Sequence, residues 1–349
     1  MMKSIRRLSA GLLAGVLALT LAACGGDTAD NSGENNNSSV SVNAKALEPV
    51  MTVNGQEIDA GFYAASYLYS KANVENMMRQ YGVSDLWTGE MGETYKEQLK
   101  EVTDNQVIAL CLVPGQFEAA GLELTEEDRA GFGTLSGDFE AAGFTEELYQ
   151  QYAEYYAELE KLDAYYFGEN GTMAPEESEI ESYYQEHYMR AKHVLISTTD
   201  EGNQEITDEE TLKQLEAKAQ DIYQRAINGE DFDALIDEYG EDPGFSSYPD
   251  GYVFTEGEML VEFEDAVKAL EINGISAPVK SSYGWHIVQR LPLRAEDRPD
   301  VFKAIVQSIT GMDMNSLLNQ WVGEAEVTRE PLLDEITFDN VEDYKYNAE

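Results

Sequence analysis

The hydrophobic pattern of the chain changes near Tyr188, and this change limits the possible folds more than any other feature of the sequence. Before Tyr188, apolar residues recur every three or four positions, as on one face of an amphipathic helix. From 189 to 196 they alternate as in a strand, and the elements predicted up to residue 291 are strand, helices, strand, helix, strand and strand. Helical periodicity returns from 301 to about 324. The sequence therefore predicts an α+β unit inserted between two parts of a helical domain.

The helical part is predicted to begin with a hairpin. Asn54 and Gly55 stand between two short apolar stretches, which is a strong local signal for a two-residue turn. Asp59 follows at the position of a helix cap, so a helix is predicted over about 60–81. Another helix, beginning near Glu93, is expected to bend or stop at Pro114, because proline cannot donate a backbone hydrogen bond.

A further long helix is predicted after Thr145, which is a good capping residue. Its apolar residues form one stripe along the helix. This stripe either faces the domain's own core or also offers tyrosine rings to apolar segments of other polypeptides. The residues of the stripe are Leu148, Tyr152, Tyr155, Leu159, Leu162 and Tyr166.

The first residues have the pattern of a targeting segment. Three basic residues precede an uncharged apolar run over about 10–23, which is too short to span a bilayer. The run ends in Leu-Ala-Ala-Cys24, which resembles the bacterial lipobox. This resemblance implies a signal peptide over 1–23 and a lipid on Cys24, and hence a protein anchored on the outer face of the cytoplasmic membrane. An ordinary secretory signal with an incidental cysteine is the alternative.

The composition excludes several kinds of partner and site. The chain has 67 acidic and 23 basic residues, a net charge of −44, so nucleic acid is not an expected partner. The acidic surface either keeps the protein soluble or favours basic, unfolded clients or cell-wall cations. The sequence has only three scattered histidines and no phosphate-binding loop or catalytic triad, so no metal or other cofactor is expected.

Cys111 lies in an apolar run and is expected to be buried and inert. Residues 24–47, rich in Asn, Ser and Gly, are expected to form a flexible tether.

Five motifs between residues 187 and 292 resemble, in order and spacing, the parvulin family of peptidyl-prolyl isomerases. The resemblance implies a four-stranded antiparallel sheet with flanking helices, and an activity that rotates the bond before proline. In sequence order the motifs are Ala191-Lys192-His193-Val194-Leu195-Ile196, Gly229-Glu230-Asp231-Phe232, Glu241-Asp242-Pro243-Gly244, the segment 257–266 and Gly284-Trp285-His286-Ile287-Val288.

The resemblance assigns catalytic roles to three residues. His193 and His286 match the family's two histidines and are expected to face each other beneath the pocket as a neutral pair within a hydrogen-bond network. A purely structural clasp between two strands is the alternative. Asp242 stands where some parvulins have cysteine and others aspartate, so it is expected to tune the polarity around the rotating bond rather than to attack it. The alternative is a simple turn at Asp242-Pro243-Gly244.

The resemblance also assigns the residues that bind substrate. Met259 and Phe263 are expected to form the apolar floor for the proline ring, because they would lie one helical turn apart on one face. Plain core residues are the alternative. The family's usual pocket leucine has no clear counterpart in the segment 249–254, and Tyr252 and Phe254 in this segment are the other candidate substrate contacts.

The lipobox, hairpin, helical region, single parvulin unit and returning helix together resemble PrsA-type foldases and, more distantly, SurA chaperones. This implies a helical chaperone-like domain over 48–186, a parvulin domain over 187–292, and a C-terminal helix and acidic tail over 293–349 that pack on the N-terminal domain. The expected function is isomerisation of X-Pro bonds in secreted polypeptides, together with holding of unfolded clients. In the alternative, a holdase lipoprotein, the parvulin domain only binds peptide. A solute-binding lipoprotein would need two large α/β lobes, which the sequence does not indicate.

Overall fold

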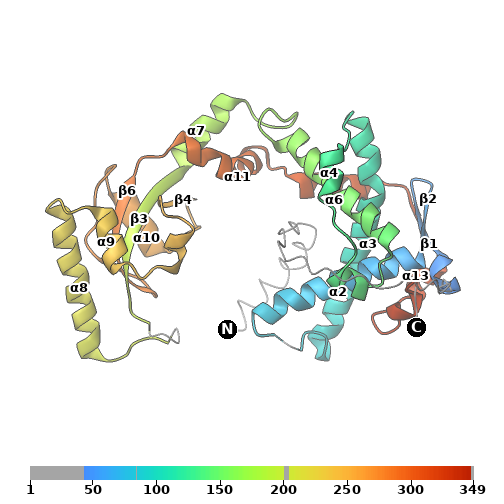
Figure 1. The fold of residues 1–349 in the computed structure, drawn as a ribbon, viewed down its shortest axis with the longest axis horizontal. Coiled ribbons are helices and arrows are strands. Elements are labelled where there is room, and N and C mark those ends of the chain that lie inside the picture. Colours follow the sequence, from blue (N-terminus) through green and yellow to red (C-terminus); the bar gives the residue numbers. More distant parts are fainter. Residues whose placement is uncertain (1–42, 84, 200–203, 347–349) are drawn as a thin grey trace, which may run out of the picture. The chain divides into compact units, whose positions relative to one another are not determined.

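The computed structural model describes residues 43–83, 85–199 and 204–346, which divide into two compact units. The helical unit comprises the residues up to 173 and those from 312 onward, and the α+β unit comprises 174–311 (Figure 1). The second unit is therefore inserted in the first. This agrees with the fold class predicted from the change of hydrophobic period.

The helical unit begins with the predicted hairpin. Strands β1 (Pro49–Val53) and β2 (Gln56–Asp59) pair antiparallel across Asn54 and Gly55, whose φ values are 48° and 87°. Both turn residues are left-handed, a conformation that Asn and Gly adopt most readily. The Asp59 carboxylate accepts the Phe62 N–H at 2.8 Å and caps α2 (Ala60–Gln80), so the predicted cap is also confirmed.

A third strand, β7 (Val327–Arg329), pairs with the other edge of β1. It joins the two sequence segments of the helical unit, and three residues are too few for a periodic signal in the sequence. The helical unit also contains these elements: η2 (Ala44–Leu47), α4 (Glu126–Ala130), α5 (Gly137–Ala141), α12 (Met314–Glu324), α13 (Pro331–Glu335) and η5 (Val341–Tyr344).

The longest helix, α3 (Gly89–Ala119), does not stop at Pro114. Pro114 itself is exposed. Val113 and Phe117, which come one residue before and three residues after the proline, are buried and hold the helix on both sides of it. Tertiary packing therefore overrides the local preference for a break.

Helix α6 (Glu146–Phe167) carries the predicted tyrosine stripe and packs on α3. Leu148, Tyr152, Tyr155 and Leu162 are buried, so this part of the stripe belongs to the unit's own core. Tyr166 is half-buried, and its ring centroid lies 6.1 Å from that of Trp321 in α12. Cys111 is half-buried rather than fully buried, and desolvation raises the pKa of its thiol to about 12.

The α+β unit contains the four-stranded antiparallel sheet that the sequence predicted. The strand order is β4-β3-β6-β5, with the long central strands β3 (Tyr188–Ser197) and β6 (Gly284–Leu291) paired along most of their length. The edges are β4 (Tyr252–Thr255) and β5 (Val279–Lys280). Strand β5 is short, because Ile275 before it forms only an isolated bridge with Gln289.

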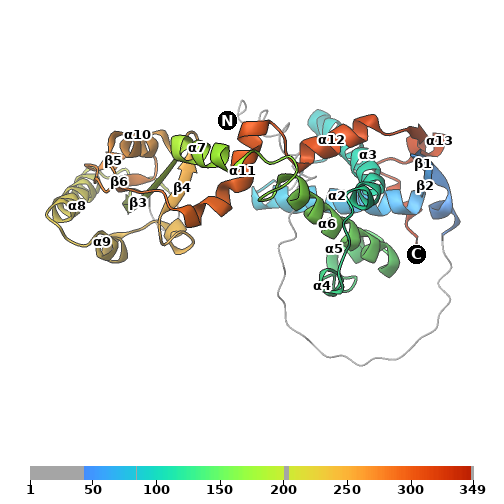
Figure 2. The ribbon, with the colours of Figure 1, turned by 90° about the horizontal axis from the view of Figure 1, so that it is seen from above.

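Helices cover both faces of this sheet (Figures 1 and 2). Val194, Ile196 and Ile287 face α8 (Glu209–Ile227) and α9 (Phe232–Tyr239). Ala191 and Val288 face α10 (Val261–Ala269). Since successive residues of a strand point to opposite faces, this alternation decides which side of the sheet His193 occupies.

The α+β unit extends further than the 187–292 expected from the motifs. It includes α7 (Glu177–His187) before the sheet and α11 (Arg298–Thr310) after it. The two helices pack together, and Arg298 of α11 lies 2.8 Å from Glu181 of α7. Among the described residues, no helix combines the length and apolarity needed to cross a membrane.

Candidate active site in the α+β unit

Two central strands bring His193 and His286 together. In the register of β3 with β6, His193 pairs with Val288 and Leu195 pairs with His286, so both histidines lie on the face covered by α10. Their Nδ1 atoms are 2.9 Å apart, and both side chains are buried. The structure thus places the two rings as the sequence predicted, in contact beneath a cavity.

Asp242, in the loop that follows α9, extends this pair by a hydrogen bond to His193. Its Oδ2 lies 2.8 Å from His193 Nε2 and accepts the Tyr252 hydroxyl at 2.6 Å, while its Oδ1 accepts the Gly244 N–H at 3.0 Å. A Cβ atom at Gly244 would lie 2.3 Å from the Tyr252 hydroxyl oxygen, so only glycine permits this approach. The loop is itself tied to the sheet, because Glu241 N–H donates to the Leu195 carbonyl at 3.0 Å.

At the other end of the pair, His286 Nε2 contacts the hydroxyl of Ser281 at 2.7 Å, and this hydroxyl accepts the Tyr283 N–H at 3.1 Å. A hydroxyl group therefore reaches this histidine from the turn between β5 and β6. Ser281 was missed because its position depends on the turn between β5 and β6.

Electrostatics fix the charge of Asp242. Burial alone would raise the pKa of its carboxyl group, but hydrogen bonds from His193, Tyr252 and Gly244 outweigh burial and hold the pKa well below its ordinary value. Asp242 is therefore ionised at neutral pH and can only accept hydrogen bonds. For this reason His193 must carry its proton on Nε2.

The proton on His193 Nε2 determines where the other protons of the network lie. Burial, reinforced by the neighbouring His193, lowers the pKa of His286 to about 4, so this ring is neutral near pH 7. When both rings are neutral, His193 Nδ1 accepts a hydrogen bond from His286 Nδ1–H, and His286 Nε2 accepts one from the Ser281 hydroxyl. All the hydrogen bonds then point toward Asp242. The network orients its members without needing a free proton.

A cavity of about 360 Å³ lies over this network, within the usual range for ligand pockets. Of the predicted substrate contacts, Met259, Phe263 and Tyr252 line it. Phe254 does not, because it is buried behind Phe263, with the two ring centroids 5.8 Å apart. The full lining is His193, Leu195, Asp242, Pro243, Tyr252, Met259, Leu260, Phe263, Tyr283 and His286.

Met259 reaches the cavity differently from the prediction. It lies in the turn before α10, which begins at Val261, so helical spacing does not align it with Phe263. The buried carboxylate of Glu264 holds this turn, since its Oε1 accepts the N–H groups of Gly257 at 2.7 Å and Met259 at 3.0 Å. Glu264 is thus a positioning residue that the sequence did not reveal. Its role depends on a loop that folds back on the helix.

Two other predictions concern ligands. The described part of the chain contains no group of three or more His, Cys, Asp or Glu side chains that could hold a metal ion. Cys24, the predicted lipidation site, lies outside the described residues.

Comparison with known proteins agrees with this geometry. Residues 193–291 match the family model described as the rotamase PPIC-type PPIase domain. The chain is 28% identical over 247 residues to the foldase protein PrsA of Caldanaerobacter subterraneus, which covers 69% of this chain and 72% of that protein. It is 35% identical over 138 residues to the chaperone SurA of Chromohalobacter salexigens, which covers 39% of this chain and only 30% of that protein.

Among solved structures, PrsA of Streptococcus pneumoniae aligns over 69% of this chain and 90% of its own, with 16% identity and a TM-score of 0.34. The family match spans both histidines, the Asp242 loop and the residues that line the cavity. The chain therefore carries a peptidyl-prolyl cis–trans isomerase domain of the parvulin type over residues 193–291 and is similar to PrsA foldases and SurA chaperones.

Proposed function

We propose that the protein is a lipid-anchored, extracytoplasmic foldase that isomerises X-Pro bonds in secreted polypeptides and holds unfolded clients. The observation that carries the isomerase part is the cavity over the Asp242, His193 and His286 network. One side of its wall is apolar and includes Met259 and Phe263. The other side consists of the polar groups of the network, which are already hydrogen-bonded to one another.

This arrangement suits rotation about an amide bond. Rotation breaks no covalent bond and must overcome only the loss of resonance, a barrier of about 18–20 kcal/mol. The enzyme has to hold the proline ring, exclude water and bind the twisted amide better than either planar form. Asp242 is a poor candidate for a nucleophile, because three hydrogen bonds already engage its two oxygens.

The isomerase assay uses the full chain and proline peptides that differ in the residue before proline. Asp242→Ala and Met259→Ala should each lower kcat/KM at least tenfold while the fold is retained. Asp221→Ala, a matched change on the exposed side of α8, should leave the rate unchanged. If the wild-type chain catalyses none of the peptides and still binds them, the domain is a peptide-binding module, as in the alternative function.

The chaperone part is supported by the names of the similar proteins, foldase PrsA and chaperone SurA, and by the separate helical unit. A form with residues 174–311 replaced by a short Gly/Ser linker should still suppress aggregation of an unfolded test protein. Suppression that disappears with the α+β unit, while the helical unit keeps its helical signal, would assign client holding to the isomerase domain instead.

The anchoring part is supported by the sequence around Cys24 and by the Asn- and Ser-rich segment after it. Cells that express the wild type should incorporate a fatty-acid probe into the protein, and cells that express Cys24→Ala should not. Equal labelling of the two forms would remove the lipid anchor from the proposal and leave the isomerase unaffected.

A further inference from the structure

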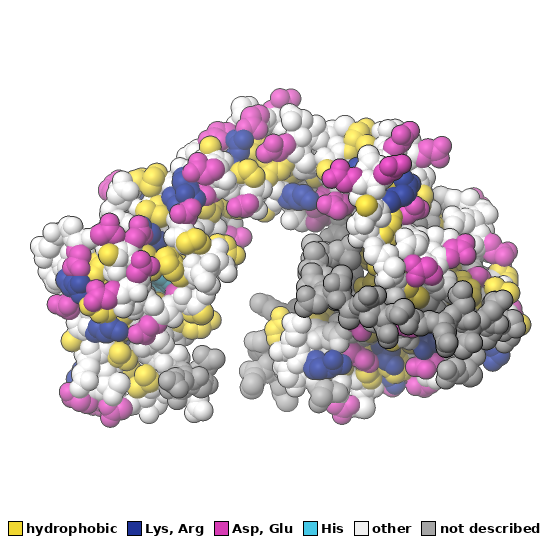
Figure 3. Space-filling model, in the orientation of Figure 1, with side chains coloured by type: hydrophobic (Ala, Val, Ile, Leu, Met, Phe, Trp, Pro, Cys, Tyr) yellow, Lys and Arg dark blue, Asp and Glu magenta, His cyan; other side chains and the backbone are white. Residues whose placement is uncertain are grey.

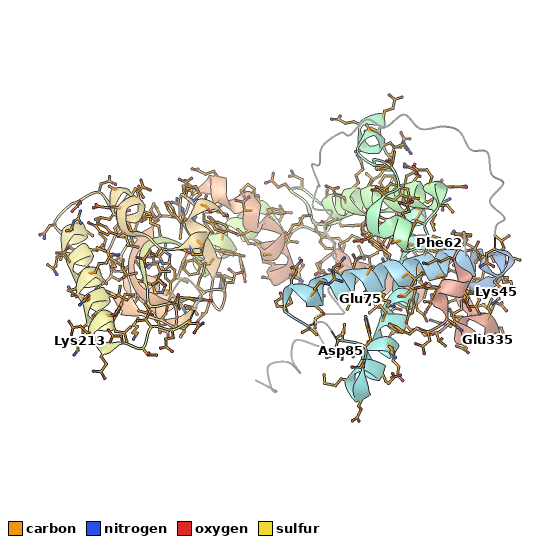
Figure 4. The ribbon with its side chains drawn as sticks, turned by 60° about the horizontal axis from the view of Figure 1, so that its bottom comes forward. Lys45, Phe62, Glu75, Asp85, Lys213 and Glu335 are labelled. Carbon is orange, nitrogen blue, oxygen red and sulfur yellow. The ribbon has the colours of Figure 1, made fainter. Side chains whose placement is uncertain are left out.

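A second, larger cavity lies within the helical unit. Its volume is about 620 Å³, and its walls come from β2, the start of α2, the last third of α3 and one side of α6, with Tyr346 near the end of the chain. Phe62, which Figure 4 labels near the start of α2, is one of its lining residues. The apolar part of the wall consists of Ile58, Phe62, Leu110, Leu148, Tyr155 and Pro114.

The rest of the wall is strongly acidic. The lining residues include five carboxylates and no lysine or arginine: Glu57, Asp59, Glu147, Glu154 and Glu158. This composition attracts cations, and the net charge of −44 and the acidic side chains spread over both units (Figure 3) reinforce it.

Two of these carboxylates have partners within the chain. Asp59 caps α2 and also accepts the hydroxyl of Tyr346 at 2.6 Å. Glu154 forms an ion pair with Arg129 of α4 at 3.0 Å. Both carboxylates therefore already have hydrogen-bond or ion-pair partners within the protein.

Glu158 differs from both. Its Oε2 atom is buried and accepts no hydrogen bond from any described residue. Burial, with a further contribution from Glu154 and an opposing one from Arg129, raises the pKa of Glu158 to about 7. A buried acceptor without a donor is unfavourable, and a cationic N–H group beside this carboxylate would supply the missing hydrogen bond.

We infer that this cavity binds the lysine or arginine side chain of a client segment whose neighbouring residues are apolar. The ammonium or guanidinium group would pair with Glu158, while the apolar neighbours contact Phe62 and Leu148. The apolar wall favours such an organic cation over a metal ion, for which the described residues offer no cluster of three ligands. The inference rests on the proposed function for the source of the segment, but it does not involve the isomerase site.

The test measures fluorescence anisotropy of labelled, proline-free peptides with the full chain. One peptide carries lysine between leucine and phenylalanine, a second has glutamate in place of the lysine, and a third keeps the lysine but has serine in place of the apolar residues. The first should bind at least tenfold more tightly than the other two. Equal affinities for the lysine and glutamate peptides would overturn the inference.

Variants then locate the site. Glu158→Gln keeps the shape of the side chain and should weaken binding of the basic peptide about tenfold. Glu160→Gln, an identical change at an exposed position of the same helix, should not weaken it. Equal losses of affinity in the two variants would show that only the overall negative charge of the surface matters, and would refute the site. Displacement of the peptide by millimolar Ca²⁺, but not by magnesium at the same concentration, would indicate a metal site instead.

The pH dependence of the wild type tests the same idea without a variant. Affinity for the basic peptide should rise between pH 6 and 8, because Glu158 becomes ionised over this range. Burial keeps the Cys111 thiol and the Tyr155 hydroxyl neutral there. A flat profile would contradict the inference, as would an equal rise in Glu158→Gln. The other titratable or charged groups near Glu158 or on the wall are Glu57, Asp59, Glu147, Tyr152, Glu154, Arg129 and Tyr346.

A parallel isomerase assay separates this inference from the proposed function. Glu158→Gln should catalyse proline isomerisation at the wild-type rate, because Glu158 lies in the helical unit. In the wild type, catalysis without any preference for the basic peptide would refute only the cation site. A preference for the basic peptide without any catalysis would refute only the isomerase.

Discussion

His193 and His286 meet through their Nδ1 atoms at 2.9 Å, so one ring must donate the proton that the other accepts. Because Asp242 requires the proton of His193 on Nε2, His286 is the donor when both rings are neutral. A proton added to His193 would occupy the accepting Nδ1 atom and reverse this contact, and a proton added to His286 would occupy Nε2 and reverse the contact with the Ser281 hydroxyl. The network is therefore sensitive to acid even though its chemistry needs no proton transfer.

We expect the α+β unit to lose stability as the pH falls from 6.5 to 4. The pKa of His286 is about 4 in the folded protein and 6.5 in the unfolded chain, so the unfolded chain binds more protons in this range. The loss should reach about 3 kcal/mol, since one pKa unit corresponds to about 1.4 kcal/mol. Urea unfolding followed by amide NMR signals of the unit measures it.

The control compares two histidine variants in the same experiment. His286→Gln should show a shallower loss between pH 6.5 and 4, and His187→Gln, at the exposed end of α7, should behave as the wild type does. The prediction fails if His286→Gln keeps the full pH dependence. Asp242 does not contribute to this loss of stability, because its lowered pKa confines its own effect on stability to pH values below about 3.8.

Tyr252→Phe should reduce isomerase activity severalfold without emptying the cavity of its aromatic ring. The change removes one of the hydrogen bonds to the Asp242 carboxylate, which is worth about 1.5–3 kcal/mol for a charged acceptor. Stability should fall by a similar or smaller amount. Tyr248→Phe is the matched control, because its ring lies 4.9 Å from that of Tyr252 but its hydroxyl does not contact Asp242. Equal effects of the two changes would exclude a role for the Tyr252 hydroxyl.

Glu264→Ala should raise KM for proline peptides, because it leaves the N–H groups of Gly257 and Met259 without their acceptor. Both hydrogen bonds are partly buried and hold the turn against α10, so the turn that carries Met259 should loosen without them. Glu262→Ala, an exposed position of the same helix, should leave KM unchanged. Steady-state kinetics over a range of peptide concentrations separate KM from kcat. A fall in kcat alone would show that Glu264 does not act by placing Met259.

The sequence predicted those features whose signals are local. Asn54-Gly55 and Asp59 specify the hairpin and the cap through their own backbone preferences. The five motifs predicted the sheet and the residues of the network, including the contact between His193 and His286. These features depend on short stretches of sequence or on a recognisable order of motifs.

The features that the sequence did not reveal depend on contacts between distant or irregular segments. Ser281 reaches His286 through a turn, and Glu264 holds Met259 through a loop that folds back on α10. The passage of α3 through Pro114 depends on core residues that face other helices. Strand β7 exists because β1 offers it an unpaired edge. None of these contacts leaves a periodic or motif signal.

Phosphorylation of the residue before proline should slow isomerisation. Among the described residues, the active-site cavity is lined by the ionised carboxylate of Asp242 and by no lysine or arginine. The segment after β3, residues 198–205, also contains three acidic residues and no basic one. A phosphate dianion would therefore face negative charge and find no basic side chain to pair with.

Paired peptides with Ser-Pro and phosphoserine-Pro test this prediction, and the phosphorylated peptide should have the lower kcat/KM. Because salt screens charges on the surface, the difference should narrow as salt is raised from 0.05 to 0.5 M. Faster turnover of the phosphorylated peptide would contradict the prediction and would require a basic group at the cavity that the described residues do not supply.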